Sequence, residues 1–341
     1  MLRILFLLLM FSCLSSENNK KSDYELLCLR IEKEPTNTSL LFERAQYNID
    51  LDNYESAIVD LKQCIQIDSI NPLFLYSLGE IYFTLSKEKN ANQKFPHLSR
   101  DYLERSLDLD SDNYKAHALM GELLLAYREF LPAISYFNNS ILIEYDQSRT
   151  HMLLGYAYNQ QGDKSKAINS FHNAISVDPE YKEAYIQIGQ LMHKDKDTVA
   201  IEYYNNALRI DSSDEIVLYN KAVFYQNILD WNQALESYAK LHSVNAFHSN
   251  GHYNLGFIHM ELGLYDIAVN NFSDAIYSNS NFFEAYYSRG ICFETLGNIM
   301  QAESDYKRAI EINSDYKYAI DALQILRNKN KNIKNEYRES N

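Results

Sequence analysis

The amino-acid sequence predicts an all-α protein made of a helix pair that repeats along the chain. Glycine recurs in a column at Gly79, Gly121, Gly155, Gly189, Gly256 and Gly290, with successive spacings of 42, 34, 34, 67 and 34. Ala222 divides the gap of 67 into 33 and 34, and Ala45 stands one such period before Gly79. The 341 residues include only 10 Gly and 5 Pro, too few for a fold with many tight β-turns. A period of 34 in eight copies indicates a solenoid of stacked repeats.

Each copy has the pattern of two amphipathic helices joined by a tight turn. A second small-residue column lies twelve residues after the first, at Ala57, Ala133, Ala167, Ala234, Ala268 and Ala302. The eight copies cover residues 38–71, 72–113, 114–147, 148–181, 182–214, 215–248, 249–282 and 283–316. The second copy has eight additional residues and the fifth lacks one. Positions are counted from the first residue of each copy, allowing for this insertion and this deletion.

The fourth copy, residues 148–181, carries Leu154-Gly155, Tyr158, Gly162-Asp163, Ala167, Phe171, Ala174 and Asp178-Pro179. With this spacing the chain resembles the tetratricopeptide repeat (TPR) family over nearly its whole length. The resemblance implies a TPR solenoid, a right-handed superhelix of about eight helix-turn-helix repeats. Small residues at positions 8 and 20 are expected where paired helices approach closely, and Gly at position 15 is expected to take φ > 0 at the end of the first helix.

The segments flanking the repeats are expected to cover the ends of the stack, because an uncovered end copy exposes an apolar face. The segment 23–37 fits an N-terminal capping helix that ends before Pro35. Residues 317–327 fit a C-terminal capping helix. Residues 328–341 are polar and are expected to form a disordered tail.

The N-terminus has the layout of a signal peptide, with a basic start, eight apolar residues at 4–11 and then Ser12. A run of eight is far short of the roughly 20 residues that span a bilayer. Met10-Phe11-Ser12-Cys13 resembles the lipobox of bacterial lipoproteins, in which the Cys becomes the lipidated first residue. We therefore expect a signal peptide at 1–12, lipidation at Cys13, a polar tether at 13–22, and anchoring to the outer or cytoplasmic membrane. The alternatives are a cleaved signal with an incidental Cys, which gives a secreted or periplasmic protein, and a start codon placed upstream of the true one.

In the TPR family, partners bind chiefly in a concave groove lined by the first helices, at positions 2, 5, 9, 12 and 13. Of the forty such residues here, eight are aromatic, seven acidic and three basic. The resemblance places a partner-binding groove on Tyr76, Tyr156, Tyr219, Tyr253, Phe257 and Tyr287. Aromatic anchors dominate many interfaces, and this groove suits a partner helix or an extended segment. The alternative is that the position-5 tyrosines pack against the neighbouring helix.

One variant of the family binds the C-terminal carboxylates of chaperones with Lys at position 5 and Asn at position 9. Neither column contains those residues, so a chaperone-tail clamp is not expected. The insertion from Lys87 to His97 is the one long excursion between paired helices. It is either a functional loop or a tolerated surface insertion.

No enzymatic activity and no cofactor are expected, because the sequence has no Gly-rich phosphate loop and no room for a catalytic domain after residue 316. His248, His252 and His259 have a spacing that would suit a metal site, but His252 and His259 fall at packing positions, as do His117 and His151, so no metal is predicted. Cys28, Cys64 and Cys292 read as small helix residues without CxxC spacing. A formal net charge of −14 disfavours nucleic acid as a partner, and no small-molecule substrate is expected.

These observations favour a membrane-anchored TPR scaffold that binds protein partners in the cell envelope. By analogy with envelope lipoproteins built of TPRs, such a scaffold serves in the assembly of envelope complexes. The alternative is a non-lipidated adaptor, secreted or cytosolic, that regulates a partner enzyme. The fate of Cys13 distinguishes the two.

Overall fold

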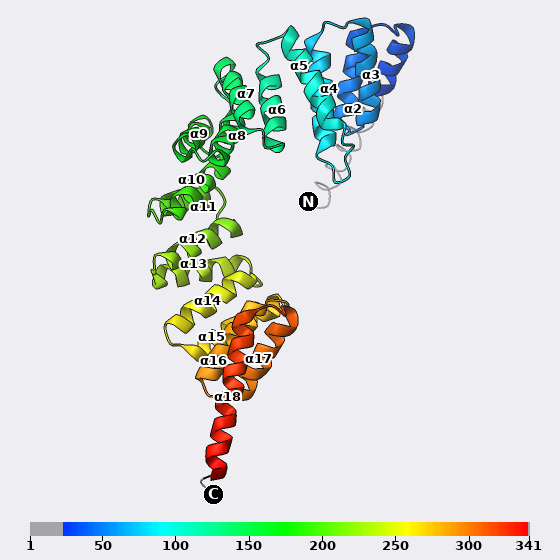
Figure 1. Cartoon of the computed structure of the whole chain (residues 1–341). Helices are drawn as coiled ribbons and strands as arrows, with labels where there is room; N and C mark the ends of the chain where they lie inside the picture. Colours follow the sequence, from blue (N-terminus) through cyan, green and yellow to red (C-terminus); the bar gives the residue numbers. More distant parts are fainter. Residues whose placement is uncertain (1–22, 340–341) are drawn as a thin grey trace, which may run out of the picture. The chain divides into compact units, whose positions relative to one another are not determined.

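The computed structural model describes residues 23–339, and every regular element in that range is an α-helix (Figure 1). The chain divides into two compact units, an N-terminal unit that ends at Pro179 and a C-terminal unit that begins at Glu180. The predicted signal peptide (1–12), Cys13 and the tether (13–22) lie outside the described residues. Between residues 23 and 339, no helix is both long and apolar enough to cross a lipid bilayer.

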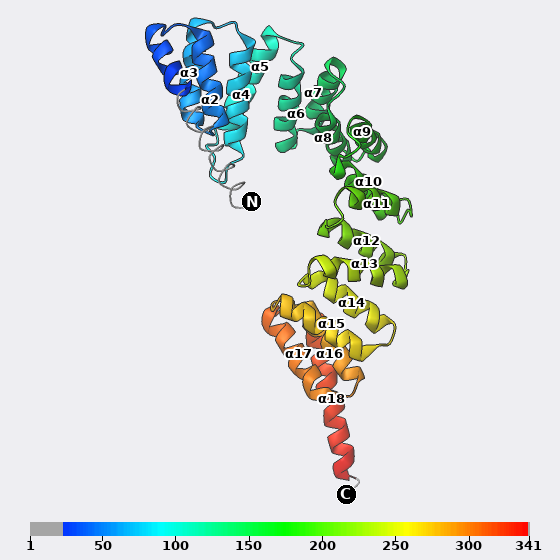
Figure 2. The ribbon, with the colours of Figure 1, turned by 180° about the vertical axis from the view of Figure 1, so that it is seen from behind.

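In the N-terminal unit, a helix over residues 23–33 precedes four helix pairs. The first helices of these pairs are α2 (Thr38–Asp50), α4 (Pro72–Ser86), α6 (Tyr114–Ala126) and α8 (Ser148–Gln160). The second helices are α3 (Tyr54–Ile67), α5 (Phe95–Leu109), α7 (Phe130–Ile143) and α9 (Lys164–Val177). Helices α2 to α5 lie side by side in both views (Figures 1 and 2).

The C-terminal unit contains four more pairs and a long last helix. The first helices are α10 (Lys182–Lys194), α12 (Glu215–Asn227), α14 (Ser249–Glu261) and α16 (Phe283–Thr295). The second helices are α11 (Ala200–Ile210), α13 (Trp231–Val244), α15 (Tyr265–Ser278) and α17 (Ile299–Ile312), and α18 (Lys317–Glu339) follows.

Close approach of paired helices explains the position-8 glycines. A Cβ added to Gly121 would lie 2.5 Å from a ring carbon of Phe137, and one added to Gly290 would lie 2.6 Å from a ring carbon of Tyr306. Both rings are buried at position 24 of the same copy. The large ring of the second helix therefore fills the space that the glycine leaves on the first.

Position 15 takes a positive φ in seven of the eight copies. Gly162, Gly263 and Gly297 do so as predicted, with φ of 82°, 74° and 80°. Four copies place a non-glycine residue in the same conformation, at Asp52, Arg128, Lys196 and Leu229. The turn geometry is thus imposed by the helix pair, whether or not a glycine is present to accept it cheaply.

In several copies an Asp or Asn side chain at position 31 holds the turn that leads to the next copy. The carboxylates of Asp68 and Asp211 accept a hydrogen bond from the backbone N–H two residues on, at 3.3 and 3.1 Å. Asn245 and Asn279 do the same with their amide oxygens, at 2.9 and 3.1 Å. This is the local turn that Asp and Asn side chains favour.

An arginine clasp joins the two helices of a copy in both units. Arg44 binds Asp60 through two hydrogen bonds of 2.9 and 2.7 Å, and Arg289 binds Asp305 through two of 2.8 Å. Each pair joins position 7 to position 23. Arg289 also donates to Ser273 Oγ of the preceding copy at 3.0 Å, so the clasp fixes one copy against the next. The sequence reasoning missed this motif, although the two pairs have the same separation along the chain.

The two ends of the repeat array are covered by helices. Leu27 and Ile31 are buried in the same cluster as Leu41, and Leu323 and Leu326 are buried with Tyr306. The C-terminal helix differs from expectation, because α18 continues to Glu339 through the segment that we expected to be a disordered tail. The tail has no Gly or Pro, and its Lys, Arg and Glu residues favour a helix, whereas the expectation of disorder rested on polarity alone.

The insertion of the second copy is partly helical. Only residues 87–94 form a loop, and α5 begins at Phe95. The Phe95 ring packs on Tyr82 with centroids 5.7 Å apart, and Arg100 forms an ion pair with Glu129 of the next copy. The last three residues of the insertion therefore form the start of α5, and Arg100 of the same helix contacts the third copy.

Candidate partner-binding groove

Three tyrosines at position 5 lie half-buried on successive first helices of the C-terminal unit, Tyr219 on α12, Tyr253 on α14 and Tyr287 on α16. Each ring is paired with the ring at position 34 of the same copy. The centroid distances are 5.1 Å for Tyr219–His248, 4.9 Å for Tyr253–Phe282 and 5.4 Å for Tyr287–Tyr316. Tyr318 on α18 adds a ring 5.6 Å from Tyr316.

We call these seven residues, Tyr219, His248, Tyr253, Phe282, Tyr287, Tyr316 and Tyr318, the aromatic ladder. Sequence reasoning found only the position-5 members. The partners at position 34 form a column of their own, because His248, Phe282 and Tyr316 are also one repeat period apart. The spacing of this column is visible in the sequence, but its three members share only a flat ring and not a residue type.

Two phenols of the ladder, those of Tyr316 and Tyr287, have a raised pKa and stay protonated at neutral pH. Burial raises the pKa of Tyr316 to about 12, assisted by Tyr253, Tyr287 and the negative charge of Glu284. Burial likewise raises the pKa of Tyr287. These two hydroxyls therefore act as neutral hydrogen-bonding groups. The Tyr219 hydroxyl accepts a hydrogen bond from Asn254 at 3.2 Å.

A cavity of about 460 Å³ lies beyond the ladder between α16 and α18. Its walls are the apolar side chains of Ile291, Ala322 and Ile325, with Tyr306 and Thr295. Glu294 stands at one side, where one carboxylate oxygen accepts from Lys329 Nζ at 3.0 Å and the other from the Tyr306 hydroxyl at 3.1 Å. Because Ile291 and Glu294 occupy positions 9 and 12 of the same helix face as Tyr287, ladder and cavity form one surface.

The N-terminal unit has a different cavity, of about 350 Å³, among α4, α6 and α8. Tyr76 lines it and donates to Glu80 at 3.2 Å. Glu122, in the same wall, is held by two hydrogen bonds from Arg149 of 2.8 and 3.0 Å and lies 3.9 Å from Lys87. This groove is polar, and its Glu122 is paired with basic side chains of the chain itself.

The six candidate residues are thus divided between the two units. Tyr219, Tyr253 and Tyr287 come together in the aromatic ladder, and Phe257 lies half-buried one turn beyond Tyr253 on α14. In the N-terminal unit, Tyr156 is half-buried with its ring against the core Phe171, 5.8 Å between centroids, and it does not line the cavity of Tyr76.

Two of the three histidines that suggested a metal site, His248 and His252, have structural partners. Each position-4 histidine places Nε2 against the carbonyl oxygen six residues earlier: His117 on Ser111 at 2.9 Å, His151 on Tyr145 at 3.1 Å and His252 on Ala246 at 2.9 Å. His248 caps α14 by accepting from the Gly251 N–H at 3.0 Å. Within the described residues, no group of three or more His, Cys, Asp or Glu is placed to hold a metal ion.

A further histidine, His242 on α13, was not among the residues singled out from the sequence. Its ring stacks on His252 with centroids 3.8 Å apart and planes tilted by 17°. Burial, then the nearby His252 and His248, lowers the pKa of His242 to about 4. The α13–α14 interface therefore favours the neutral form of His242.

The described cysteines are free thiols. Cys64 and Cys292 are buried, as their helix positions suggested, and burial raises the pKa of each thiol to about 11. A thiol of high pKa is a poor nucleophile at neutral pH, which fits a packing role.

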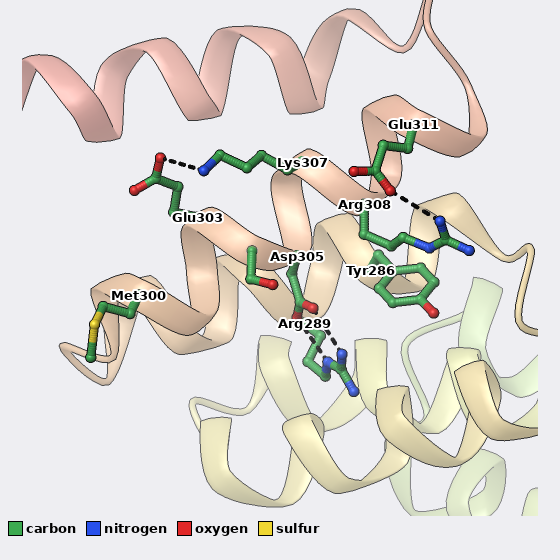
Figure 3. Close-up of a pocket in the computed structure, with 9 residues that line it drawn as sticks. Tyr286, Arg289, Met300, Glu303, Asp305, Lys307, Arg308 and Glu311 are labelled. Atoms are coloured by element: carbon green, nitrogen blue, oxygen red, sulfur yellow. Dashed lines mark hydrogen bonds and ion pairs between the residues drawn. The ribbon is translucent and has the colours of Figure 1, made fainter.

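A second cavity of about 460 Å³ lies on α16 and α17 and is lined by charged residues (Figure 3). Arg289 points to Asp305, Lys307 to Glu303 and Arg308 to Glu311, and each cation is within 3.0 Å of its carboxylate. Since every cation of this cavity already has a partner, it offers no free charge to a ligand.

Comparison with protein families finds tetratricopeptide repeats at residues 38–71, 249–282 and 283–316, and a further TPR match at 155–196. The first three ranges coincide with the limits of three predicted copies. A comparison with curated proteins found no match.

Two solved structures share the fold. The C-terminal part of a TPR repeat-containing protein from Cytophaga hutchinsonii is 14% identical, with a TM-score of 0.64 over 73% of this chain and 99% of that one. The pilF protein of Pseudomonas aeruginosa is 16% identical, with a TM-score of 0.51 over 61% of this chain and 92% of that one. The fold is therefore an all-helical TPR solenoid, and the chain has the architecture of a protein-interaction scaffold.

Proposed function

We propose that this protein is a lipid-anchored scaffold of the cell envelope that holds a protein partner in the groove of its C-terminal unit. In such a scaffold the anchor and the groove have separate tasks. The anchor fixes the location of the protein, and the groove selects the partner. A tether of this kind raises the effective concentration of its partner at the membrane without any catalysis.

The observation that carries the groove assignment is the aromatic ladder with its adjoining cavity. Partner-binding surfaces are enriched in Tyr and other aromatic residues that supply large contact area at low entropic cost. Tyr318 is 68% exposed and Ile325 is 54% exposed, so the end of the ladder and the mouth of the cavity present apolar surface to solvent. A helix or an extended segment of a partner would cover both.

The anchor is supported by the sequence of the first thirteen residues, a basic start and an apolar run that lead to Ser12-Cys13. Several acyl chains on one Cys would hold a soluble unit firmly, at about 0.8 kcal/mol per buried CH₂. Residues 14–22 then supply a polar spacer.

The anchor is tested by intact mass and detergent partitioning of the native protein beside a Cys13→Ser variant. We expect a mature chain that begins at Cys13, carries added acyl mass and partitions into detergent, all of which the variant loses. An unmodified chain would contradict anchoring. It would favour the alternative, a non-lipidated adaptor that regulates a soluble enzyme.

The groove is tested by crosslinking in cells with a Tyr253→Ala/Tyr287→Ala variant. We expect loss of a specific crosslinked partner while the helical content and melting temperature stay close to the parent values. Tyr76→Ala, at the same position in the N-terminal unit, is the matched control and should retain the crosslink. A crosslink that survives in the double variant would contradict the groove assignment.

A further inference from the structure

We infer that the aromatic ladder and its cavity bind a basic segment, one that presents lysine or arginine side chains to the groove. This inference rests on the proposed function and names the chemistry of the partner. It follows from three features of the C-terminal unit: rings without a cation over them, carboxylates without an ion pair, and an ammonium group of the chain itself in the cavity.

The rings of the ladder are free of cations. Elsewhere in the described chain, Lys87 lies over Phe83 at 3.8 Å and Arg289 lies over Phe293 at 5.7 Å. Among the residues that the structure describes, no Lys or Arg lies over a ladder ring. An aromatic face attracts a cation within about 6 Å of its centroid, so the solvent-exposed part of the ladder, above all Tyr318 at 68% exposure, can accept a partner's cation.

Three carboxylates stand on the first helices of the last two copies and on α18. Glu284 occupies position 2 beside Tyr316, and its charge contributes to the raised pKa of that phenol. Glu261 and Asp321 stand at positions 13 and 5 of α14 and α18. Within residues 180–329, none of these three carboxylates forms an ion pair. A basic segment would neutralise them.

Lys329 shows how an ammonium group fits the cavity. Its Nζ lies 3.0 Å from Glu294, and the Lys329 side chain is 63% exposed whereas that of Glu294 is 24% exposed. The carboxylate is thus fixed in the wall, and the lysine reaches it from the solvent side. A lysine of a partner could take the same place with little rearrangement, because exposed ion pairs are worth only about 0–1 kcal/mol.

The N-terminal groove lacks this complementarity. Its carboxylate Glu122 accepts two hydrogen bonds from Arg149 and lies 3.9 Å from Lys87, so it has two cationic partners where Glu294 has one. Glu80 accepts a hydrogen bond from Tyr76. Both basic groups come from the chain itself. A basic segment would gain little there, so the N-terminal groove provides a matched control.

Fluorescence anisotropy of labelled peptides with the full chain tests this inference. The probes are a peptide of alternating lysine and alanine, its glutamate counterpart of the same length, and polyproline, which suits aromatic grooves for a different reason. We expect the lysine peptide alone to bind, more weakly as salt rises. Preferential binding of the glutamate peptide or of polyproline would overturn the inference.

Two sets of variants locate the binding. Glu284→Gln with Glu294→Gln should weaken the lysine peptide about five-fold, since each surface pair contributes up to ~1 kcal/mol. Tyr253→Leu and Tyr287→Leu should each weaken it about two- to five-fold through the lost cation–ring contact. Glu183→Gln and Tyr76→Leu, at positions 2 and 5 outside the ladder, should leave it unchanged. Melting curves verify that each variant is folded, and unchanged binding in the glutamate double variant would contradict the inference.

The two proposals fail differently. Suppose the crosslinked partner is lost on Tyr253→Ala/Tyr287→Ala but the lysine peptide does not bind. The groove then has a partner of other chemistry, and only this inference is wrong. Suppose instead that partner capture does not depend on the two tyrosines. The proposed function of the groove is then wrong, whatever the peptides do.

Discussion

At position 9 of the third copy, the N-terminal unit places Glu122, held by Arg149 and Lys87. At position 9 of the seventh and eighth copies, the C-terminal unit places Phe257 and Ile291. The helix positions are equivalent and the backbone pattern is the same, but one copy holds a carboxylate between two basic side chains where the others present an aromatic and an aliphatic side chain. The repeat therefore fixes where a groove side chain lies, and the residue type at each copy decides what the groove can bind.

The largest expected effect tests what the units share. Asp305→Ala in the C-terminal unit and Asp60→Ala in the N-terminal unit each remove the carboxylate of an arginine clasp. Loss of one partner of a buried pair costs about 3–5 kcal/mol. The value should lie near the lower end, because the arginine side chains are 19% and 24% exposed and keep some hydration.

Chemical denaturation of both variants checks this prediction. Glu311→Ala, which removes an exposed partner of Arg308, is the control and should cost less than about 1 kcal/mol. A clearly unequal cost of the two clasp variants would mean that the units differ in their scaffold and not only in their grooves.

The next effect separates the two grooves. Gly290→Ala places a methyl group 2.6 Å from the Tyr306 ring, and Gly121→Ala places one 2.5 Å from Phe137. Each should lower the free energy of unfolding by about 1–3 kcal/mol through overpacking. Tyr306 lines the C-terminal cavity, so only Gly290→Ala should also weaken peptide binding there. Equal binding by the two variants would show that the cavity does not take part.

Acid should weaken the C-terminal unit at the α13–α14 interface. The folded-state pKa of His242, about 4, lies below the ordinary 6.5, so the folded state favours the neutral ring. Its contribution to stability is fully present above pH 6.5 and is lost as the pH falls from there towards 4. No carboxylate is among the groups that shift this pKa, and the imidazoles of His252 and His248 oppose the added proton.

Melting temperatures between pH 7.5 and 4.5 measure this effect. We expect His242→Gln to flatten the pH dependence. His151→Gln in the N-terminal unit should flatten it less, because burial alone lowers the pKa of His151 and no second imidazole contributes. An unchanged slope in His242→Gln would contradict the assignment.

The smallest effect is a gain in stability. Leu229 and Arg128 have φ of 61° and 62°, a conformation that costs an L residue about 1–2 kcal/mol. Leu229→Gly and Arg128→Gly should each remove that strain against about 0.5–1 kcal/mol of added chain entropy. The net gain should be a few tenths to about 1 kcal/mol in either unit, measured by chemical denaturation, whereas Gly297→Ala should lose a similar amount. Destabilisation of both glycine variants would contradict the strain argument.

Much of the fold could be read from the sequence because its strongest constraints are spatial and recur in every copy. Gly121 and Gly290 leave no space for a Cβ beside the ring of the paired helix, and this requirement repeats at the same position of most copies as a column of glycines. The left-handed residues Asp52 and Leu229 could not be found in this way, since the turn imposes its φ on residues of any type. Helix formation beyond Arg327 was missed because polarity was weighed and helix propensity was not.

The groove was only half predictable for a related reason. Position 5 repeats one residue type, at Tyr219, Tyr253 and Tyr287, whereas its ring partners are a histidine, a phenylalanine and a tyrosine. The property that they share is a flat ring, and a search for identical letters does not detect it. Charge balance within a groove, as between Glu122 and Arg149, depends on the stacking of neighbouring copies and needs coordinates.

The position-4 histidines have a consequence for how the chain opens. His117, His151 and His252 each bond the backbone of the turn that precedes their own copy, so that turn loses a partner as soon as the copy unravels. In the fifth, sixth and eighth copies the same position holds Tyr185, Leu218 and Tyr286, and the turn has no such histidine. Unfolding of neighbours should therefore be more cooperative across the junctions that enter copies three, four and seven. Hydrogen exchange should be fastest at the turns without the histidine, where one copy can fray and leave its neighbour intact.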